Sequence, residues 1–177
     1  MILLIPLGGT GQRFKSDGYT KPKALINVMG KPILFWLLDN IQYEYEFIYI
    51  PYHPEYDSHD LESILTTQYP MLTFKFLRWN QSTRGAAETI HIALSQLSID
   101  DTSMICMDAD NCYTTPSPIK KENTVVITEN KEVDPKFSYV TLNSDNQITD
   151  IQEKVKISNH ACTGAYAFKS YHQLNHY

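Results

Sequence analysis

The segment MILLIPLGGTG, residues 1–11, joins an apolar run to a glycine-rich turn and decides the class of the fold. An apolar run that is broken by a proline and then by glycines is typical of a buried strand followed by a tight turn. The run has no basic leader and is interrupted too early for a signal peptide or a membrane span. We therefore expect a buried first strand that leads into a tight turn.

Helical patterns and short apolar runs alternate along the chain up to residue 115. Helices are expected over residues 32–38, 61–65 and 86–97, and strands over residues 47–50, 72–77 and 104–107. Such alternation implies crossover connections and a mostly parallel sheet that is covered on both faces by helices. In sheets of this kind, ligands bind at the carboxyl ends of the strands.

The pattern changes to short strands with little helical periodicity after Pro116. Strands are expected over residues 124–128, 139–142, 148–151 and 165–168, with a hairpin turn at residues 143–146. This part should be strand-rich and partly antiparallel. We expect one α/β domain over residues 1–177, divided into a first half, 1–115, and a second half, 116–177.

Composition excludes some classes of partner. The chain has 177 residues, 42% of them hydrophobic, and a formal net charge of -5, which does not suit a surface that wraps nucleic acid through many phosphate contacts. Cys106, Cys112 and Cys162 lack the paired spacing of a zinc site. Reduced thiols fit a cytoplasmic protein. The net charge and the broken apolar run predict that it binds neither nucleic acid nor a membrane.

The turn after the first strand has the composition of a phosphate-binding loop. Gly8, Gly9 and Gly11 allow backbone N–H groups to approach phosphate oxygens, and Arg13 and Lys23 supply positive charge. This combination predicts a cradle for a triphosphate.

Two other glycine-loop motifs fit less well. A dinucleotide-binding fold needs a small residue where Phe14 stands, and an acidic residue after the second strand, where Ile50 is followed by Pro51. A Walker loop needs Gly-Lys-Ser/Thr, whereas Gly11 is followed by Gln12.

Two carboxylates, Asp108 and Asp110, come directly after the apolar run at residues 104–107. Carboxylates in this position suit a hard divalent cation that bridges phosphate oxygens. The same D-x-D pattern occurs in glycosyltransferases that use nucleotide sugars, so that class stays open as an alternative.

These blocks, in this order, resemble the sugar-phosphate nucleotidyltransferase family, whose opening pattern G-G-x-G-x-R-[FL] precedes P-K and G-K-P. Here P-K is residues 22–23 and G-K-P is residues 30–32, while residues 18–26 are similar to a branch linked to bacterial capsule and surface-polysaccharide synthesis. The resemblance implies a Rossmann-like, three-layer α/β fold of the GT-A-like kind. It also implies a need for Mg²⁺ and transfer of a nucleoside monophosphate from an NTP to a phosphorylated acceptor, with release of pyrophosphate.

The resemblance assigns roles to residues of the first half. Arg13 would hold the triphosphate, Lys23 would reach the α-phosphate and the incoming phosphate, and Asp110 would bind Mg²⁺. The expected nucleotide-binding residues are Leu7, Gly8, Gly9, Thr10, Gly11, Asn80, Gly85, Ala86 and Asp108. Asn80 and Gly85 would contact the base, with CTP and UTP or dTTP left as alternatives.

The second half matches the segments that line the acceptor pocket in the family. The expected acceptor-binding residues are Ser138, Glu153, Lys154 and Gly164. Ser138 replaces a glycine and Val155 a proline, so a changed acceptor is expected, with sugar 1-phosphates and small alcohol phosphates both open.

Family members usually continue further and supply a second metal-binding Asp from a C-terminal part. We therefore expect such a part to be missing here, or Asp108 or water to complete the metal site. A fusion to another domain, a homo-oligomer and a non-catalytic nucleotide-binding regulatory domain are further alternatives.

Overall fold

A computed structural model describes residues 1–9, 11–41, 45–81, 83–113 and 122–175. The elements are, in chain order, β1 Ile2–Leu4, α1 Gln12–Ser16, η1 Lys23–Leu25, β2 Asn27–Val28, β3 Lys31–Pro32, α2 Ile33–Leu38, β4 Phe47–Tyr52, η2 Pro54–His59, α3 Leu61–Gln68, β5 Phe74–Arg78, α4 Ala86–Gln96, β6 Met104–Met107, β7 Thr124–Glu129, β8 Ser138–Leu142, β9 Ile148–Glu153, β10 His160–Phe168 and α5 Tyr171–Asn175. Every helix and strand expected from the periodicity is present, with ends shifted by a few residues.

Eight strands form one sheet in the order β5-β4-β1-β6-β10-β8-β9, with β7 paired to β10, and β2 and β3 form a separate hairpin. The four neighbouring strands β5, β4, β1 and β6 are parallel, and β10 runs antiparallel to β6, β7 and β8. The mostly parallel first half and the antiparallel second half are thus confirmed. The chain passes from β5 on one side to β6 on the other side of β1, which makes the carboxyl ends of β1 and β6 the expected ligand position.

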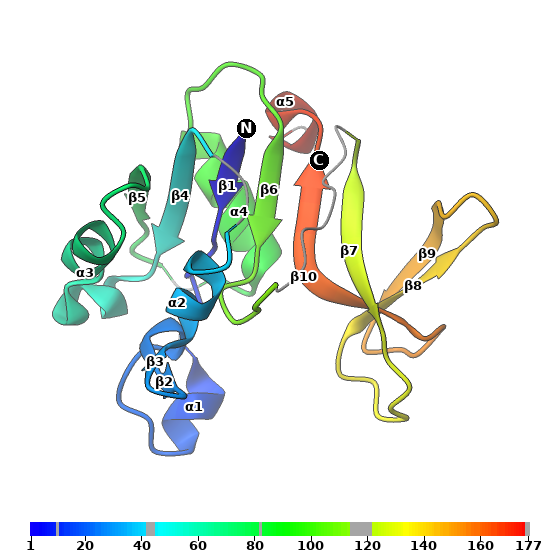
Figure 1. Cartoon of the computed structure of the whole chain (residues 1–177), viewed down its shortest axis with the longest axis horizontal. Coiled ribbons are helices and arrows are strands. Elements are labelled where there is room, and N and C mark those ends of the chain that lie inside the picture. The colour runs from blue at the N-terminus through cyan, green and yellow to red at the C-terminus, as the bar shows by residue number, and fades with distance from the viewer. Residues whose placement is uncertain (10, 42–44, 82, 114–121, 176–177) are drawn as a thin grey trace.

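Helices cover both faces of the sheet (Figure 1), as expected for three layers. Side chains of β1 alternate between the two sides. Leu3 packs with apolar residues of α2 and α3, whereas Leu4 packs with Ala93 and Leu94 of α4 and Tyr171 of α5. Because β1 and β6 are buried on both faces of the sheet, nearly all of their residues are apolar.

The segment between β1 and η1 is more ordered than the long polar loop expected there. Gly11 adopts φ +59°, a left-handed conformation that glycine takes at little cost, and the five-residue helix α1 follows it. Gln12, Arg13 and Lys15 are good helix formers, which explains a short helix in a polar segment. Figure 1 shows α1 and the β2–β3 hairpin beyond the carboxyl ends of the parallel strands.

Strand β10 connects the two halves of the sheet. Its last four residues pair with β6, its first two pair with β8, and β7 runs along it with an irregularity between Cys162 and Tyr166. Gly164 lies in that irregularity with φ +81°. As a result, β10 passes the carboxyl end of β6 and reaches the β8–β9 hairpin.

The hairpin turn expected at residues 143–146 is confirmed. The side chain of Asn143 accepts hydrogen bonds from the backbone N–H groups of Asp145 and Gln147, and Asn146 has φ +59°. Figure 1 shows the hairpin extending away from the parallel half.

The three cysteines are free in the structure. Cys106 and Cys162 are buried free thiols, and Cys112 is an exposed one. In the part of the chain that the structure describes, no helix is both long and apolar enough to cross a membrane.

Candidate active site

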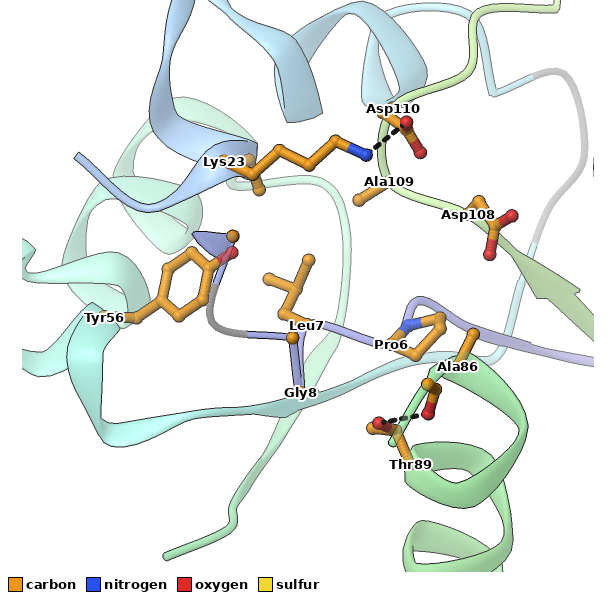
Figure 2. A pocket seen from close by; sticks show the side chains of 14 residues that line it. Pro6, Leu7, Gly8, Lys23, Tyr56, Ala86, Thr89, Asp108, Ala109 and Asp110 are labelled. Atoms are coloured by element: carbon orange, nitrogen blue, oxygen red, sulfur yellow. Dashed lines mark hydrogen bonds and ion pairs between the residues drawn. The ribbon is translucent and has the colours of Figure 1, made fainter. Parts of the chain in front are cut away.

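A cavity of about 320 Å³ opens at the carboxyl ends of β1 and β6 (Figure 2). The turn after β1, the two 3₁₀ turns, the first turn of α4 and the loop after β6 all contribute to it. Its lining residues are Pro6, Leu7, Gly8, Gly9, Gly11, Lys23, Ala24, Tyr56, Gly85, Ala86, Thr89, Asp108, Ala109 and Asp110. The cavity therefore lies where the strand order predicts a ligand.

Gly8 packs directly against a pair of threonine hydroxyl groups. A Cβ atom at Gly8 would lie 2.3 Å from Oγ1 of Thr89 and 2.9 Å from Oγ1 of Thr83. The two hydroxyl groups are 2.7 Å apart, and that of Thr89 also donates to the carbonyl oxygen of Gly85 at 3.1 Å. This contact holds the glycine turn against the first turn of α4.

We predict that Thr89→Val destabilises the protein by about 1–2 kcal/mol, because Thr89 is buried and the change removes the hydrogen bond between the hydroxyl groups of Thr83 and Thr89. It also removes one of the two hydrogen bonds to the carbonyl of Gly85, which keeps the one from the backbone N–H of residue 89. Thr89→Ser keeps the hydroxyl and should lose clearly less. Denaturant unfolding of the two variants checks this, and equal stabilities would show that the hydroxyl group contributes nothing.

The cavity holds one close ion pair. Lys23 extends from η1 across the cavity, and its Nζ lies 2.5 Å from Oδ2 of Asp110 (Figure 2). Both side chains are partly exposed, so solvent and ligands can reach them. Groups that are far apart in the sequence thus meet at the position where a phosphate and a cation would bind.

Asp108 lies deeper than Asp110. Its burial, followed by the nearby charge of Asp110, raises the pKa of its carboxyl to about 6, although Lys23 acts in the opposite direction. No hydrogen bond to its carboxylate is found among the described residues, and its Oδ2 packs against Gly164 of β10. A carboxylate held in this way weakens the fold and is available to a ligand.

Asp108→Asn is therefore expected to stabilise the metal-free protein by on the order of 1–2 kcal/mol at pH 8. In the unfolded chain this carboxyl titrates near 3.8, and in the folded protein near 6. The folded state bears the cost of the buried charge in full above pH 6 and loses it as the pH falls towards 4. Thermal unfolding in EDTA at pH 8 and pH 4 measures the difference, which should shrink at the lower pH.

A second, larger cavity of about 730 Å³ adjoins the first one. It lies between α4 on one side and β10 with the β8–β9 hairpin on the other. Its lining residues are Pro6, Arg84, Gly85, Ala86, Ala87, Ile90, His91, Leu94, Cys106, Met107, Asp108, Ser138, Glu153, Gly164, Tyr166, Phe168 and Leu174. Pro6, Gly85, Ala86 and Asp108 line both cavities and form their junction.

Gly164 allows β10 to approach Asp108 closely. The backbone N–H of Asp108 donates to the carbonyl oxygen of Gly164 at 2.8 Å. A Cβ at Gly164 would lie 2.4 Å from Oδ2 of Asp108 and 2.8 Å from Nδ2 of Asn111. The junction therefore depends on a glycine in the second half of the chain.

Most of the residues expected at the site are brought together. The first cavity contains Leu7, Gly8, Gly9, Gly11, Lys23, Gly85, Ala86, Asp108 and Asp110, and the second contains Ser138, Glu153 and Gly164. Thr10 lies outside the described residues.

Three of the expected residues line neither cavity. Arg13 is exposed on α1. Asn80 is exposed after β5, where its side-chain oxygen accepts a hydrogen bond from Arg78. Lys154 pairs with the adjacent Glu153 at 3.2 Å. Their roles in ligand binding stay predictions, since the fold does not point these side chains into the described cavities.

Sequence reasoning missed several lining residues. Tyr56 and Thr89 line the first cavity, and His91 lines the second. The sequence contains a signal for Thr89, because this residue precedes Ala93 by four residues and so occupies a core-facing position of the expected helix. A polar residue on such a face marks a specific hydrogen bond.

The donor set suits Mg²⁺ bound partly by the chain and partly by phosphate. Asp108 and Asp110 offer hard carboxylate oxygens at the cavity, and the described residues contain no group of three or more metal-binding side chains. Mg²⁺ commonly takes one or two carboxylates together with phosphate oxygens and water. The residues present therefore fit a magnesium ion that arrives with a phosphate ligand.

No protein-family model and no curated protein matches the sequence. The structure, in contrast, is similar to a nucleoside-diphosphate-sugar pyrophosphorylase from Vibrio cholerae RC9, with a TM-score of 0.84 and 19% identity over 98% of this chain and 75% of that one. An inositol-1-phosphate CTP transferase from T. maritima matches with a TM-score of 0.75 and 15% identity, over 94% of this chain and 69% of that one. A UDP-glucose pyrophosphorylase in complex with UDP-glucose matches with a TM-score of 0.74 and 20% identity, over 95% of this chain and 75% of that one. The chain therefore has the fold of the nucleotide-sugar pyrophosphorylases and nucleotidyltransferases.

Proposed function

We propose that the protein is a nucleotidyltransferase that transfers a nucleoside monophosphate from an NTP to a phosphorylated small molecule and releases pyrophosphate. The observation that carries this proposal is the pair of adjoining cavities, which share Asp108 and the first turn of α4. A reaction between two substrates needs two sites whose reacting ends meet, and such proximity accounts for much of the rate of a group transfer.

In this proposal the NTP occupies the first cavity. Backbone N–H groups of the glycine turn face the triphosphate, and Lys23 lies where it can neutralise the α-phosphate. An oxygen of the acceptor phosphate attacks the α-phosphorus from the second cavity, and the bond to pyrophosphate breaks. Nucleotidyl transfer depends on in-line placement and charge neutralisation, so the chain needs no covalent nucleophile.

Asp110, with Asp108 beside it, would hold Mg²⁺. When bound, the ion supplies charge neutralisation at the phosphates. Lys23 and Asp110 neutralise each other in the structure, so binding of the triphosphate to Lys23 would free the carboxylate for the cation. Nucleotide and cation are therefore expected to bind with positive cooperativity.

The remaining assignments belong to the same proposal. Arg13 would contact the outer phosphates and Asn80 the base, in each case after a movement of the side chain towards the first cavity. A pyrimidine NTP, a cytoplasmic location and a role in capsule or surface-polysaccharide synthesis are predictions from the sequence resemblance.

The second candidate is a glycosyltransferase that uses a nucleotide sugar, which the two carboxylates after β6 would also suit. A glycosyltransferase has no pyrophosphate to expel, whereas the glycine turn and Lys23 suit a full triphosphate. A non-catalytic nucleotide-binding domain would use the first cavity alone.

The deciding experiment is an assay of pyrophosphate release with Mg²⁺, in which each common NTP is combined with a panel of sugar 1-phosphates and small alcohol phosphates. Release that depends on an acceptor supports the proposal and identifies both substrates. Tight NTP binding without release would favour the non-catalytic domain. Release of a nucleoside diphosphate from a nucleotide sugar would favour the glycosyltransferase.

A further inference from the structure

We propose that Tyr113 is a positioning residue of the metal site, because it attaches the loop that carries Asp108 and Asp110 to strand β10. This inference rests on the proposed nucleotidyl transfer, in which the two carboxylates hold Mg²⁺. It adds a residue that lines neither cavity and that acts on the cation only through the loop.

The loop after β6, residues 108–113, contains both carboxylates but belongs to no helix or strand. Asp108 follows the last residue of β6, a turn occupies residues 109–110, and the chain is irregular from there to Tyr113. Figure 2 shows the two carboxylates on this loop. Since no regular element fixes the loop, the position of each carboxylate depends on how the loop is attached to its neighbours.

Two hydrogen bonds attach the loop to consecutive residues of β10. The backbone N–H of Asp108 donates to the carbonyl oxygen of Gly164 at 2.8 Å. At the other end of the loop, the hydroxyl group of Tyr113 donates to the carbonyl oxygen of Thr163 at 2.7 Å. Asp108 is thus fixed through its own backbone, whereas Asp110 lies between the two attachments and depends on both.

The carbonyl group of Thr163 is available to Tyr113 because the pairing of β10 with β7 is interrupted there. The register runs up to Cys162 and resumes at Tyr166, with Gly164 at φ +81° in between. Thr163 therefore has no partner residue on β7 in the described register. A partly buried carbonyl group without a hydrogen bond costs free energy, and the phenol of Tyr113 supplies the bond.

Both groups of this hydrogen bond are themselves held in place. Oγ1 of Thr163 donates to the carbonyl oxygen of Val126 on β7 at 2.9 Å. Tyr113 packs, together with Ala109 of the same loop, against the core cluster that contains Ala165 of β10. Tyr113 therefore joins the loop to the sheet, which is the rigid part of the site.

The hydroxyl group of Tyr113 serves as a donor and not as a ligand of the cation. Burial raises the pKa of this phenol to about 12, and the nearby charges of Asp108 and Asp110 act in the same direction. The phenol is therefore neutral at neutral pH, and its proton is directed to Thr163. Mg²⁺ prefers carboxylate and phosphate oxygens, so the effect of Tyr113 reaches the cation through Asp110.

Two other contacts of the loop are weak or are lost when the nucleotide binds. Nδ2 of Asn40 donates to Sγ of Cys112 at 3.4 Å, and sulfur is a poor acceptor. Lys23 holds Asp110 at 2.5 Å, and we expect the triphosphate to take over Lys23. Once the nucleotide is bound, the bond from Tyr113 is therefore the main attachment of the loop beyond Asp110.

The two carboxylates of the loop repel each other. After burial, the charge of Asp110 is the second reason why the pKa of Asp108 is raised. A loop free at its far end would let the two groups separate, and the cation would then have to bring them together again. The hydroxyl group of Tyr113 prevents this, so the site is arranged before the cation arrives.

The test removes one hydroxyl group. Tyr113→Phe keeps the ring and deletes the donor, so it should weaken binding of Mn²⁺, a paramagnetic substitute for Mg²⁺, about tenfold. Electron paramagnetic resonance measures this affinity on the protein with each common NTP in turn, without any turnover. NTP binding in EDTA should not change, because Tyr113 lines neither cavity. An unchanged Mn²⁺ affinity in Tyr113→Phe would overturn the inference and leave the proposed function standing.

Tyr171→Phe is the matched control. The hydroxyl group of Tyr171 also donates to main-chain carbonyl oxygens, those of Leu94 and Leu97, both at 2.9 Å, and Tyr171 lines neither cavity. This variant should have a lower thermal midpoint and an unchanged affinity for Mn²⁺. An equal loss of Mn²⁺ affinity in the two variants would mean that any lost phenol hydrogen bond has this effect, which would also overturn the inference.

A double variant tests whether Tyr113 acts through the carboxylate. In the Asp110→Asn background, Tyr113→Phe should reduce the Mn²⁺ affinity by less than about threefold, because the group that the phenol positions is already gone. Full additivity of the two changes would show that Tyr113 acts independently of Asp110. If the tenfold loss is found but no acceptor gives pyrophosphate release, the proposed reaction fails and the role of Tyr113 in cation binding stands.

Discussion

Replacing Asp110 with asparagine is expected to lower kcat for pyrophosphate release about 100- to 1000-fold, which corresponds to roughly 3–4 kcal/mol of lost transition-state stabilisation. The amide keeps the size of the side chain but cannot neutralise a cation. The carboxylate is exposed and paired with Lys23, so the fold should survive its loss. Steady-state rates at several Mg²⁺ concentrations provide the measurement, and the concentration for half-maximal rate should rise.

Asp134→Asn serves as the matched control for this variant. Asp134 is an exposed surface residue 3.9 Å from Lys136, outside both cavities. Its rate should equal that of the unmodified protein. A rate close to that of the unmodified protein in Asp110→Asn, together with an unchanged Mg²⁺ requirement, would exclude Asp110 as the metal ligand.

Gly8→Ala is expected to weaken NTP binding about 100-fold and to destabilise the fold by about 1–3 kcal/mol. The added methyl group would overlap Oγ1 of Thr89, so either the glycine turn or the first turn of α4 must move. Both segments line the first cavity, which explains why one methyl group affects binding so strongly. Isothermal titration with the NTP and denaturant unfolding measure the two effects.

Two further variants separate this contact from a general effect of removing glycine. Gly9→Ala should leave the unfolding free energy nearly unchanged, because no atom of the described residues other than the two chain neighbours lies within 4 Å of the added Cβ. Combining Gly8→Ala with Thr89→Ala removes the nearest obstacle, so the double variant should be more stable than the sum of the two single changes predicts. Strict additivity would mean that the two positions do not interact.

The fold could be predicted from the sequence wherever local periodicity carries the information. The apolar runs at β1 and β6 and the spacing along α4 gave the alternation that leads to a parallel sheet. Helix α1 was not expected, because a five-residue segment with Phe14 as its one apolar residue shows no periodicity and the helix depends on the left-handed turn at Gly11. The pairing of β10 with both β6 and β8 could not be predicted either, since strand order depends on contacts between distant segments.

The residues of the candidate site also fall into those that local motifs predict and those that they do not. The glycine turn and the carboxylates after β6 are contiguous motifs, so reasoning from sequence found them. Tyr56 and His91 were missed because each lies on a separate element and reaches its cavity only through tertiary packing. Arg13 was expected at the site but lines neither cavity. A position in a motif does not determine the direction of a side chain, and α1 leaves this residue exposed.

The place of β10 in the sheet has a consequence for synthesis of the protein on the ribosome. One edge of the fully buried strand β6 pairs with β1. The other edge pairs with β10, a later segment of the chain, whose Ala165 lies opposite Met107. Until residue 168 has left the exit tunnel, the nascent chain therefore presents a wholly apolar strand with unsatisfied backbone groups. Exposed edges of this kind recruit other chains, so this interval should be the period in which the polypeptide depends most on chaperones.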